Sequence, residues 1–187
     1  VRIRLDNTFG TEAIEIGAAY VGHRVQREIL AKGSNRPVLF DGATTVRIPV
    51  GGTVTSDPVT MKVATQDDLA VSLYVAGADV QPSQHGGAFA TSYLTANGTG
   101  NVAADEVPPV PGSTRPAASP FTETTTSTFW LKAIDVLSST STGAIVTIGD
   151  SITDGSCSTV DGWDRWVDVL AVRLALAGIP KAVINEG

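Results

Sequence analysis

A serine that could act as a nucleophile lies in residues 148–155, which read IGDSITDG. A serine hydroxyl attacks a carbonyl only when a base takes its proton and when N–H donors stabilise the oxyanion that forms. The backbone N–H of Ser151 could be one of those donors. Gly149 would let the chain turn sharply, and Asp150 and Asp154 could brace the turn by accepting backbone N–H groups. The pattern predicts nucleophilic catalysis by Ser151.

Three other interpretations of this loop compete with the nucleophile. An ordinary turn also uses glycine, aspartate and serine, but here a strand pattern precedes the loop and a helix and a strand follow it. In a calcium loop that starts at Asp150, the third position must supply an oxygen ligand, and Ile152 stands there. A phosphate loop requires a Gly-Lys-Ser/Thr ending, which the sequence lacks. The nucleophile is therefore the interpretation we favour.

The residues around the loop predict a strand, a helix and a second strand. Residues 144–148 form a continuous apolar run, typical of a parallel strand buried on both faces. Residues 164–177 have a helical pattern that ends at Gly178, and residues 182–184 begin another apolar strand. This order opens a parallel sheet and places Ser151 at the carboxyl end of its first strand, where open α/β sheets bind ligands.

The preceding residues predict a separate β-rich domain. Strands are predicted at 1–5, 46–50, 69–75 and 128–136. Frequent turn residues between them favour a jelly-roll-like sandwich of antiparallel sheets. Residues 98–120, rich in Pro, Gly and Ser, are expected to be an exposed loop or linker, and a Ser/Thr-rich hinge at 138–143 places the domain boundary near 140.

Composition narrows the classes of partner. The chain is 42% hydrophobic and 17% charged, with a net charge of −6. Nucleic acid and anionic membranes attract basic surfaces, so neither is an expected partner. No apolar stretch approaches the length of a membrane span, and we expect no membrane insertion. Uncharged substrates fit this composition better.

Residues 148–155 resemble block I of the SGNH (GDSL-type) serine hydrolase family. Residues 166–171 (WVDVLA) also resemble that family, and residues 183–187 (VINEG) are similar to the opening of its block II. Residues 4–10 (RLDNTFG) and 91–93 (TSY) are similar to the β-rich domain that precedes the hydrolase domain in some secreted microbial members. The resemblance spans nearly the whole chain and is most specific at block I.

The resemblance implies a fold and a reaction. The fold would be an all-β sandwich at 1–140, followed at 141–187 by the first βαβ unit of a flavodoxin-like, three-layer α/β hydrolase domain. The reaction would be carboxylic ester hydrolysis, by an esterase or deacetylase, through an acyl-enzyme on Ser151, with no metal or organic cofactor. The attached sandwich favours acetylated carbohydrate as the ester substrate. A lipase-like or lysophospholipase-like acyl hydrolase is the alternative.

The catalytic Asp and His of that family come from a late Asp-x-x-His motif, which this sequence lacks. The residues three positions before His23 and His85 are Tyr20 and Pro82. We therefore interpret both as surface or packing histidines of the sandwich, with His85, beside two glycines, the one that could approach a ligand. Because a lone βαβ unit leaves its sheet uncovered, we expect a second polypeptide, as in a nicked chain, to complete the domain and supply the catalytic Asp and His.

Several single residues carry further expectations. Trp163, close to the loop, could line the substrate cleft. Asp161 and Asp164 are interpreted as a loop acid and a helix N-terminal acid rather than catalytic carboxylates. Cys157 is expected to be a small buried residue. A glycosylation sequon at 97–99 favours a secreted protein.

Two functions without catalysis also remain open. In the first, the sandwich binds carbohydrate and the Ser151 loop is degenerate. In the second, the chain serves mainly to complete and orient a partner subunit. Labelling of Ser151 by an active-site reagent would distinguish the enzyme from both.

Overall fold

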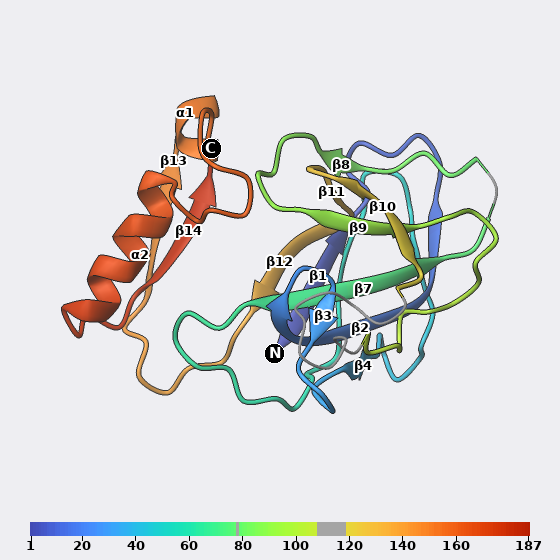
Figure 1. The fold of residues 1–187 in the computed structure, drawn as a ribbon, viewed down its shortest axis with the longest axis horizontal. Coiled ribbons are helices and arrows are strands. Elements are labelled where there is room, and N and C mark those ends of the chain that lie inside the picture. The colour runs from blue at the N-terminus through green and yellow to red at the C-terminus, as the bar shows by residue number, and fades with distance from the viewer. Residues whose placement is uncertain (78, 108–118) are drawn as a thin grey trace. The chain divides into compact units, whose positions relative to one another are not determined.

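The computed structural model describes residues 1–77, 79–107 and 119–187. It is mostly β-strand, with two helices among these residues (Figure 1). The chain divides into two compact units, each described by itself below. Unit 1 comprises Val1–Gln84, Tyr93–Thr125 and Phe129–Val136, and unit 2 comprises His85–Ser92, Thr126–Thr128 and Leu137–Gly187. Residues 108–118 of the expected linker lie outside the described residues, and the boundary near 140 stays a prediction.

The first sheet of unit 1 has the antiparallel order β12-β1-β6. Its strands are β1 (Arg2–Asp6), β6 (Thr53–Thr55) and β12 (Leu131–Asp135). Ile3 lies opposite Ile134, and both Ile3 and Leu5 are fully buried, whereas Arg2 and Arg4 are exposed. The alternation that predicted a strand here therefore also defines its buried face.

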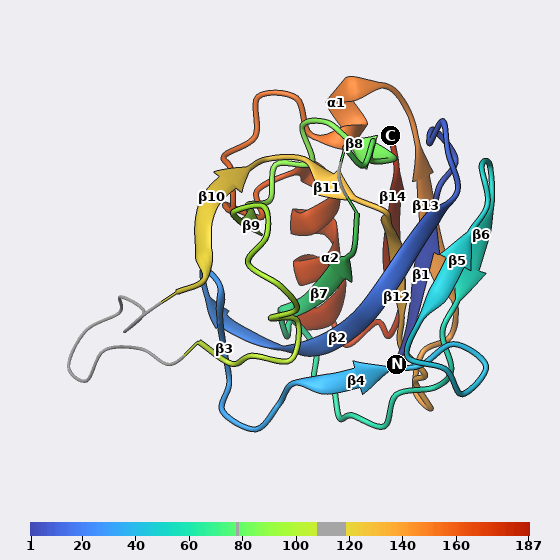
Figure 2. The same ribbon diagram turned by 90° about the vertical axis from the view of Figure 1, so that its right-hand side faces the viewer.

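A second sheet of unit 1 is organised by one long strand, β2 (Ile14–Gln26). Four shorter strands pair with it in antiparallel fashion: β3 (Ile29–Leu30), β4 (Arg36–Val38), β5 (Val46–Ile48) and β7 (Leu69–Val75). Figure 2 shows β2 running across this unit beneath β7. The sequence analysis missed β2, because residues 17–19 (GAA) interrupt its apolar–polar alternation.

Short strand pairs complete the β-rich part. They are β9 (Ser92–Thr95) with β10 (Phe121–Thr125), and β8 (Gln84–His85) with β11 (Thr128–Phe129). The strand predicted at 128–136 is in fact two strands, β11 and β12. Trp130, between them, has a φ of 53°, a left-handed conformation that interrupts an extended chain.

The core belongs almost entirely to unit 1. One buried cluster joins the two larger sheets of that unit, with Ile3, Leu5, Ile14, Ile16, Ala19, Val21, Val38, Phe40, Ile48 and Val59. Val167 is the buried apolar residue that unit 2 contributes among the described residues. Unit 1 is therefore a β-rich body with its own core, and unit 2 has little core of its own.

Unit 2 contains the expected strand, helix and strand. Its elements are β13 (Ala144–Ile148), α1 (Ser151–Asp154), α2 (Trp166–Leu176) and β14 (Ala182–Glu186). The two strands are parallel, with Thr147 opposite Asn185. The predicted burial of β13 on both faces is wrong, since Val146 and Ile148 are 53% and 84% exposed. A single helix packed along a two-stranded sheet can cover one face only.

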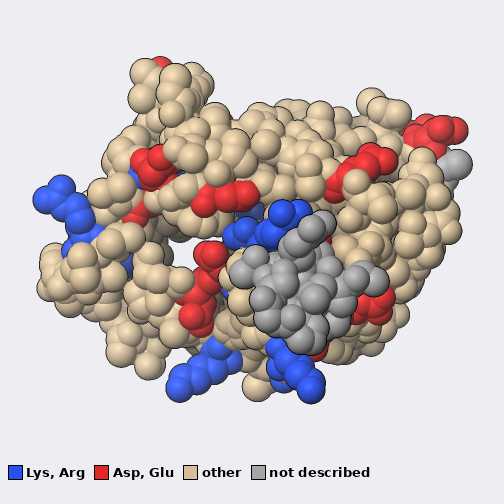
Figure 3. Space-filling model, in the orientation of Figure 1, with Lys and Arg blue, Asp and Glu red and all other residues tan. Residues whose placement is uncertain are grey.

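No described helix is both long and apolar enough to cross a membrane. On the face drawn in Figure 3, acidic and basic side chains are interspersed and most of the surface is uncharged.

Candidate active site

Ser151 is the first residue of α1, three residues after β13 ends at Ile148. The residue is exposed, and its hydroxyl has no hydrogen-bond partner within the described part of the chain. Its carbonyl accepts the N–H groups of Gly155 at 3.0 Å and Ser156 at 2.7 Å. The backbone of Ser151 is thus held by the loop, while its hydroxyl remains accessible to a substrate.

The residues before Ser151 shape the turn in two ways. Asp150 is the N-cap of α1, and its carboxylate accepts the N–H of Ile152 at 3.0 Å, as predicted. Gly149 leaves no room for a side chain, because an added Cβ would lie 2.7 Å from Cβ of Thr153 and closer still to its hydroxyl. The glycine is therefore needed for this close approach.

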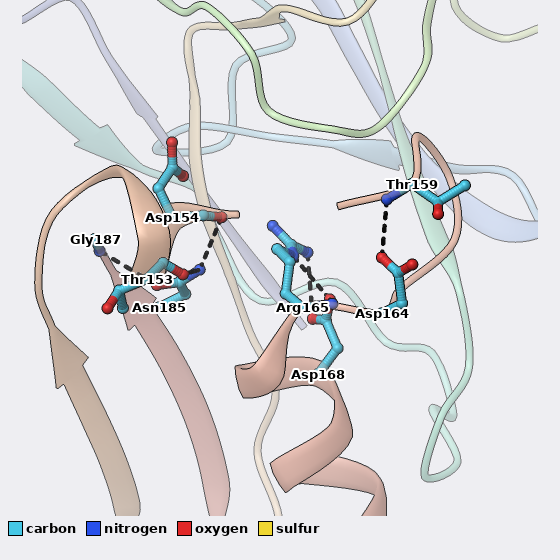
Figure 4. A network of polar contacts seen from close by, with 8 residues as sticks. All are labelled: Thr153, Asp154, Thr159, Asp164, Arg165, Asp168, Asn185 and Gly187. Atoms are coloured by element: carbon cyan, nitrogen blue, oxygen red, sulfur yellow. Dashed lines mark hydrogen bonds and ion pairs between the residues drawn. The ribbon is translucent and has the colours of Figure 1, made fainter. Parts of the chain in front are cut away.

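The end of β14 is bonded directly to α1. The side-chain amide of Asn185 donates to the carbonyls of Thr153 at 2.9 Å and Asp154 at 3.3 Å (Figure 4). Its side-chain oxygen accepts the N–H of Gly187 at 3.2 Å. The sequence analysis quoted Asn185 within a block II-like run but gave it no role. The feature that could have indicated a role is its position in the sheet, where it lies opposite the buried residue Thr147 of β13.

The side chain of Asp154 pairs with His85. His85 Nε2 lies 3.0 Å from Asp154 Oδ2, and the two side chains are 52% and 23% exposed. A carboxylate accepts hydrogen bonds, so Nε2 of His85 can donate to Asp154 in any form of the ring that carries a proton on that nitrogen. Asp154 was expected to accept a backbone N–H, and His85 was assigned to the sandwich. The structure shows Asp154 in contact with His85, and it groups His85, which is exposed as a surface histidine would be, with unit 2.

Asp161 is a loop acid, as interpreted, with a double contact to residues 85–92. Its carboxylate accepts the N–H of Thr91 at 2.8 Å and the hydroxyl of Thr91 at 2.5 Å. Its own N–H donates to the carbonyl of Phe89 at 2.9 Å. Three hydrogen bonds therefore connect the loop before α2 with a segment about seventy residues earlier.

Acidic residues also fix the start of α2 (Figure 4). Asp164 accepts the N–H of Thr159 at 3.0 Å, and hydrogen bonds from the hydroxyl and N–H of Thr159 hold the pKa of Asp164 below its usual value. Asp168 accepts the guanidinium Nε of Arg165 at 2.7 Å and its backbone N–H at 3.2 Å. Each carboxylate is thereby committed to a structural bond, consistent with the interpretation of Asp164.

Two neighbouring side chains complete the surroundings of the loop. Trp163 is 44% exposed, with the guanidinium of Arg165 5.8 Å from the centre of its ring. Its role in lining a cleft stays a prediction. Cys157 is exposed, so the expectation that it is buried is wrong. Among the described residues, no three His, Cys, Asp or Glu side chains gather as a metal site would require.

No protein-family model and no curated protein matches this chain. The functional interpretation therefore depends on the residues themselves. Of the predicted site residues, Ser151, Gly149, Asp150 and Asp154 lie together in one turn. The structure adds Asn185 and His85 to that turn.

Proposed function

We propose that this chain carries the nucleophile of a serine ester hydrolase, Ser151. The observation that carries the proposal is that Ser151 has an accessible hydroxyl on a backbone held in place by its neighbours. Its exposed hydroxyl is free of hydrogen bonds among the described residues, while the turn around it is braced by Asp150 on one side and Asn185 on the other. Nucleophiles require a fixed backbone and an accessible oxygen, and this turn supplies both.

The reaction would proceed through an acyl-enzyme. Ser151 Oγ attacks the ester carbonyl while a base takes its proton, and the backbone N–H of Ser151 helps to stabilise the oxyanion. The alcohol leaves with that proton. Water then attacks the acyl-enzyme by the same route, which releases the acid and restores the serine. No metal or organic cofactor takes part in these steps.

The base and its orienting carboxylate are proposed to come from outside residues 1–187, from a further part of the protein or from a second polypeptide, which would complete an SGNH-type α/β domain. Unit 2 offers apolar surface for it. Val146, Ile148 and Ile184 are exposed on one face of the sheet, and several apolar residues of α2 are exposed as well: Trp166, Val169, Val172 and Leu176. Exposed apolar patches of this kind mark surfaces that another element covers.

The substrate class is proposed from chemistry and composition. Because the chain is acidic, uncharged esters fit better than anionic ones. Acetylated carbohydrate is the substrate we propose, on a secreted protein in which the β-rich unit assists binding, and lipid or aryl esters are the alternative. A panel of acetylated oligosaccharides and p-nitrophenyl esters of increasing acyl length would rank these substrates.

The first prediction concerns Ser151 itself. We expect a fluorophosphonate probe to label the protein, in the assembly in which it is isolated, on the peptide that contains Ser151. Ser151→Ala should abolish that labelling and lower the hydrolysis of p-nitrophenyl acetate by at least about a thousand-fold, because the nucleophile is removed. Mass spectrometry of the labelled peptide and a spectrophotometric assay measure the two effects.

A nearby serine provides the matched control. Ser156 lies in the same loop, and its backbone N–H donates to the carbonyl of Ser151, so Ser156→Ala keeps that bond. We expect this variant to be labelled like the wild type. Labelling that persists in Ser151→Ala would overturn the proposal, and absence of labelling in the wild type would favour the carbohydrate-binding function instead.

A further inference from the structure

Residues His85–Ser92 form a segment, here named the strap, that belongs to unit 2 although unit 1 residues flank it in the sequence. It begins at the end of β8. In the sequence it lies far before the candidate nucleophile, Ser151. Contacts between residues so far apart cost chain entropy, so they persist only where the bonds formed compensate for it. The bonds that the strap makes are therefore informative.

The strap is fastened to the Ser151 loop region at both of its ends. At the first end, His85 Nε2 lies 3.0 Å from the carboxylate of Asp154, the last residue of α1. At the other end, Asp161 binds the N–H and the hydroxyl of Thr91 and donates its own N–H to the carbonyl of Phe89. Both anchors on the loop side are carboxylates, whose hydrogen bonds are stronger than those of neutral groups.

Between these ends the strap lies against the loop itself. Gly155, the residue after α1, is buried and has a φ of 138°. A Cβ added there would lie 3.2 Å from the ring of Phe89 and 2.6 Å from Cδ of Arg165. The ring of Phe89 in the strap therefore lies close to the residue that follows α1, and a side chain at position 155 would meet both Phe89 and Arg165.

The helix that carries Ser151 needs such outside support. α1 has four residues, a single turn, and one turn of helix is not stable by itself. Asp150 holds its start and Asn185 holds the carbonyls near its end. Ser151 and Asp154 are three residues apart, so their side chains leave the same side of the turn. A partner that fixes Asp154 thereby also fixes the direction of Ser151.

We propose that His85 is a positioning residue of the Ser151 site, which holds α1 through Asp154 and keeps the nucleophile in its reactive orientation. This rests on the proposed function of Ser151. His85 acts in this role as a hydrogen-bond donor through Nε2 and takes no proton from Ser151. By this proposal the strap, which the sequence analysis assigned to the sandwich, is part of the esterase site.

Two substitutions of His85 separate positioning from proton transfer. Gln can still donate a hydrogen bond to Asp154 but cannot act as a base, whereas Ala can do neither. We expect His85→Ala to lower the rate constant of fluorophosphonate labelling by about ten-fold or more, because small displacements of a nucleophile are costly. His85→Gln should recover most of that loss. If Gln is as slow as Ala, the positioning role is wrong.

A histidine in unit 1 supplies the control. His23 Nδ1 lies 3.6 Å from Asp67, so His23→Ala also removes a histidine next to a carboxylate. We expect His23→Ala to label at the wild-type rate. In a double-mutant cycle, His85→Ala combined with Asp154→Ala should be no slower than the slower single variant, because both remove one bond. Fully additive losses would overturn the proposal.

Hydrogen exchange tests the strap independently of activity. In His85→Ala, the amides of residues 151–156 should lose protection by about ten-fold or more, whereas His23→Ala should leave them unchanged. Unchanged protection in His85→Ala would overturn the positioning role even if Ser151 is the nucleophile. Conversely, if Ser151→Ala retains its labelling, the proposed function fails, while the exchange result still reports whether the strap holds α1.

Discussion

At the scale of single residues, the turn around Ser151 depends on positions where no side chain fits. Gly155 has a φ of 138°, and a Cβ there would press against Arg165 and Phe89. We expect Gly155→Ala to lower the free energy of unfolding of unit 2 by about 2 kcal/mol, from backbone strain and the displaced neighbours. Chemical denaturation followed by the fluorescence of Trp163 and Trp166, both in unit 2, measures it.

The matched control for this substitution is also in unit 2. Gly86 has no atom within 4 Å of an added Cβ and no positive φ. We expect Gly86→Ala to change the free energy of unfolding by no more than about 0.5 kcal/mol. Equal effects of the two substitutions would show that the contact at Gly155 does not stabilise the turn.

Residue-level chemistry was predictable where it depends on neighbours in the sequence. The cap formed by Asp150 is local, and the sequence analysis anticipated that its carboxylate accepts a backbone N–H. The partner of Asp154 was not, because His85 lies sixty-nine positions away. No periodicity or motif links the two, and pairing them requires the fold. Cys157 is exposed and has a φ of 72°, and no local pattern indicates either property.

At the scale of elements, loops are held by charged side chains from distant strands and turns. The carboxylate of Glu106 accepts the N–H of Gly33 at 2.7 Å and of Asn35 at 2.9 Å. These bonds, that to Gly33 first, hold the pKa of Glu106 below its ordinary value of 4.5. A carboxyl whose pKa is lowered in the folded state stabilises the protein at pH values above its ordinary pKa. This stabilisation is lost as the pH falls through the folded-state pKa.

Glu106→Gln should therefore destabilise unit 1 in a pH-dependent way. Near neutral pH we expect a loss of about 1 kcal/mol, as is typical for hydrogen bonds to a partly exposed charged group. As the pH falls through the lowered folded-state pKa of Glu106, the wild type and the variant should converge, because Glu106 becomes protonated. Urea unfolding over this range of pH measures this. Glu123→Gln, at an exposed glutamate of β10, is the control and should unfold like the wild type.

Element positions were predicted best where the pattern is regular. β7 was predicted at its observed bounds, and the parallel pair β13 and β14 followed from two apolar runs around a helix. β2 was missed, since small residues in its centre hide the alternation. The strand predicted at 128–136 was split by Trp130, whose left-handed backbone conformation its residue type does not predict.

At the scale of the whole molecule, apolar burial is divided unequally between the units. The buried cluster lies in unit 1, whereas most of the exposed large apolar residues lie in unit 2, among them Ile148, Trp166 and Leu176. Composition alone could not reveal this division, because it averages over both units. Stability that comes from apolar burial is therefore concentrated in the unit without the candidate nucleophile. Unit 2 would gain its stability from what covers its exposed faces.

This division leads to a prediction for the chain studied by itself. We expect urea to unfold it in two steps, with unit 2 unfolding at the lower concentration, because it buries less apolar surface. Trp130 lies in unit 1, and Trp163 and Trp166 lie in unit 2. A Trp163→Phe/Trp166→Phe variant should therefore report only the later step by fluorescence, while the wild type reports both. A single transition with the same midpoint in both proteins would contradict the prediction, since it would mean that unit 2 draws its stability from unit 1 and needs no other cover.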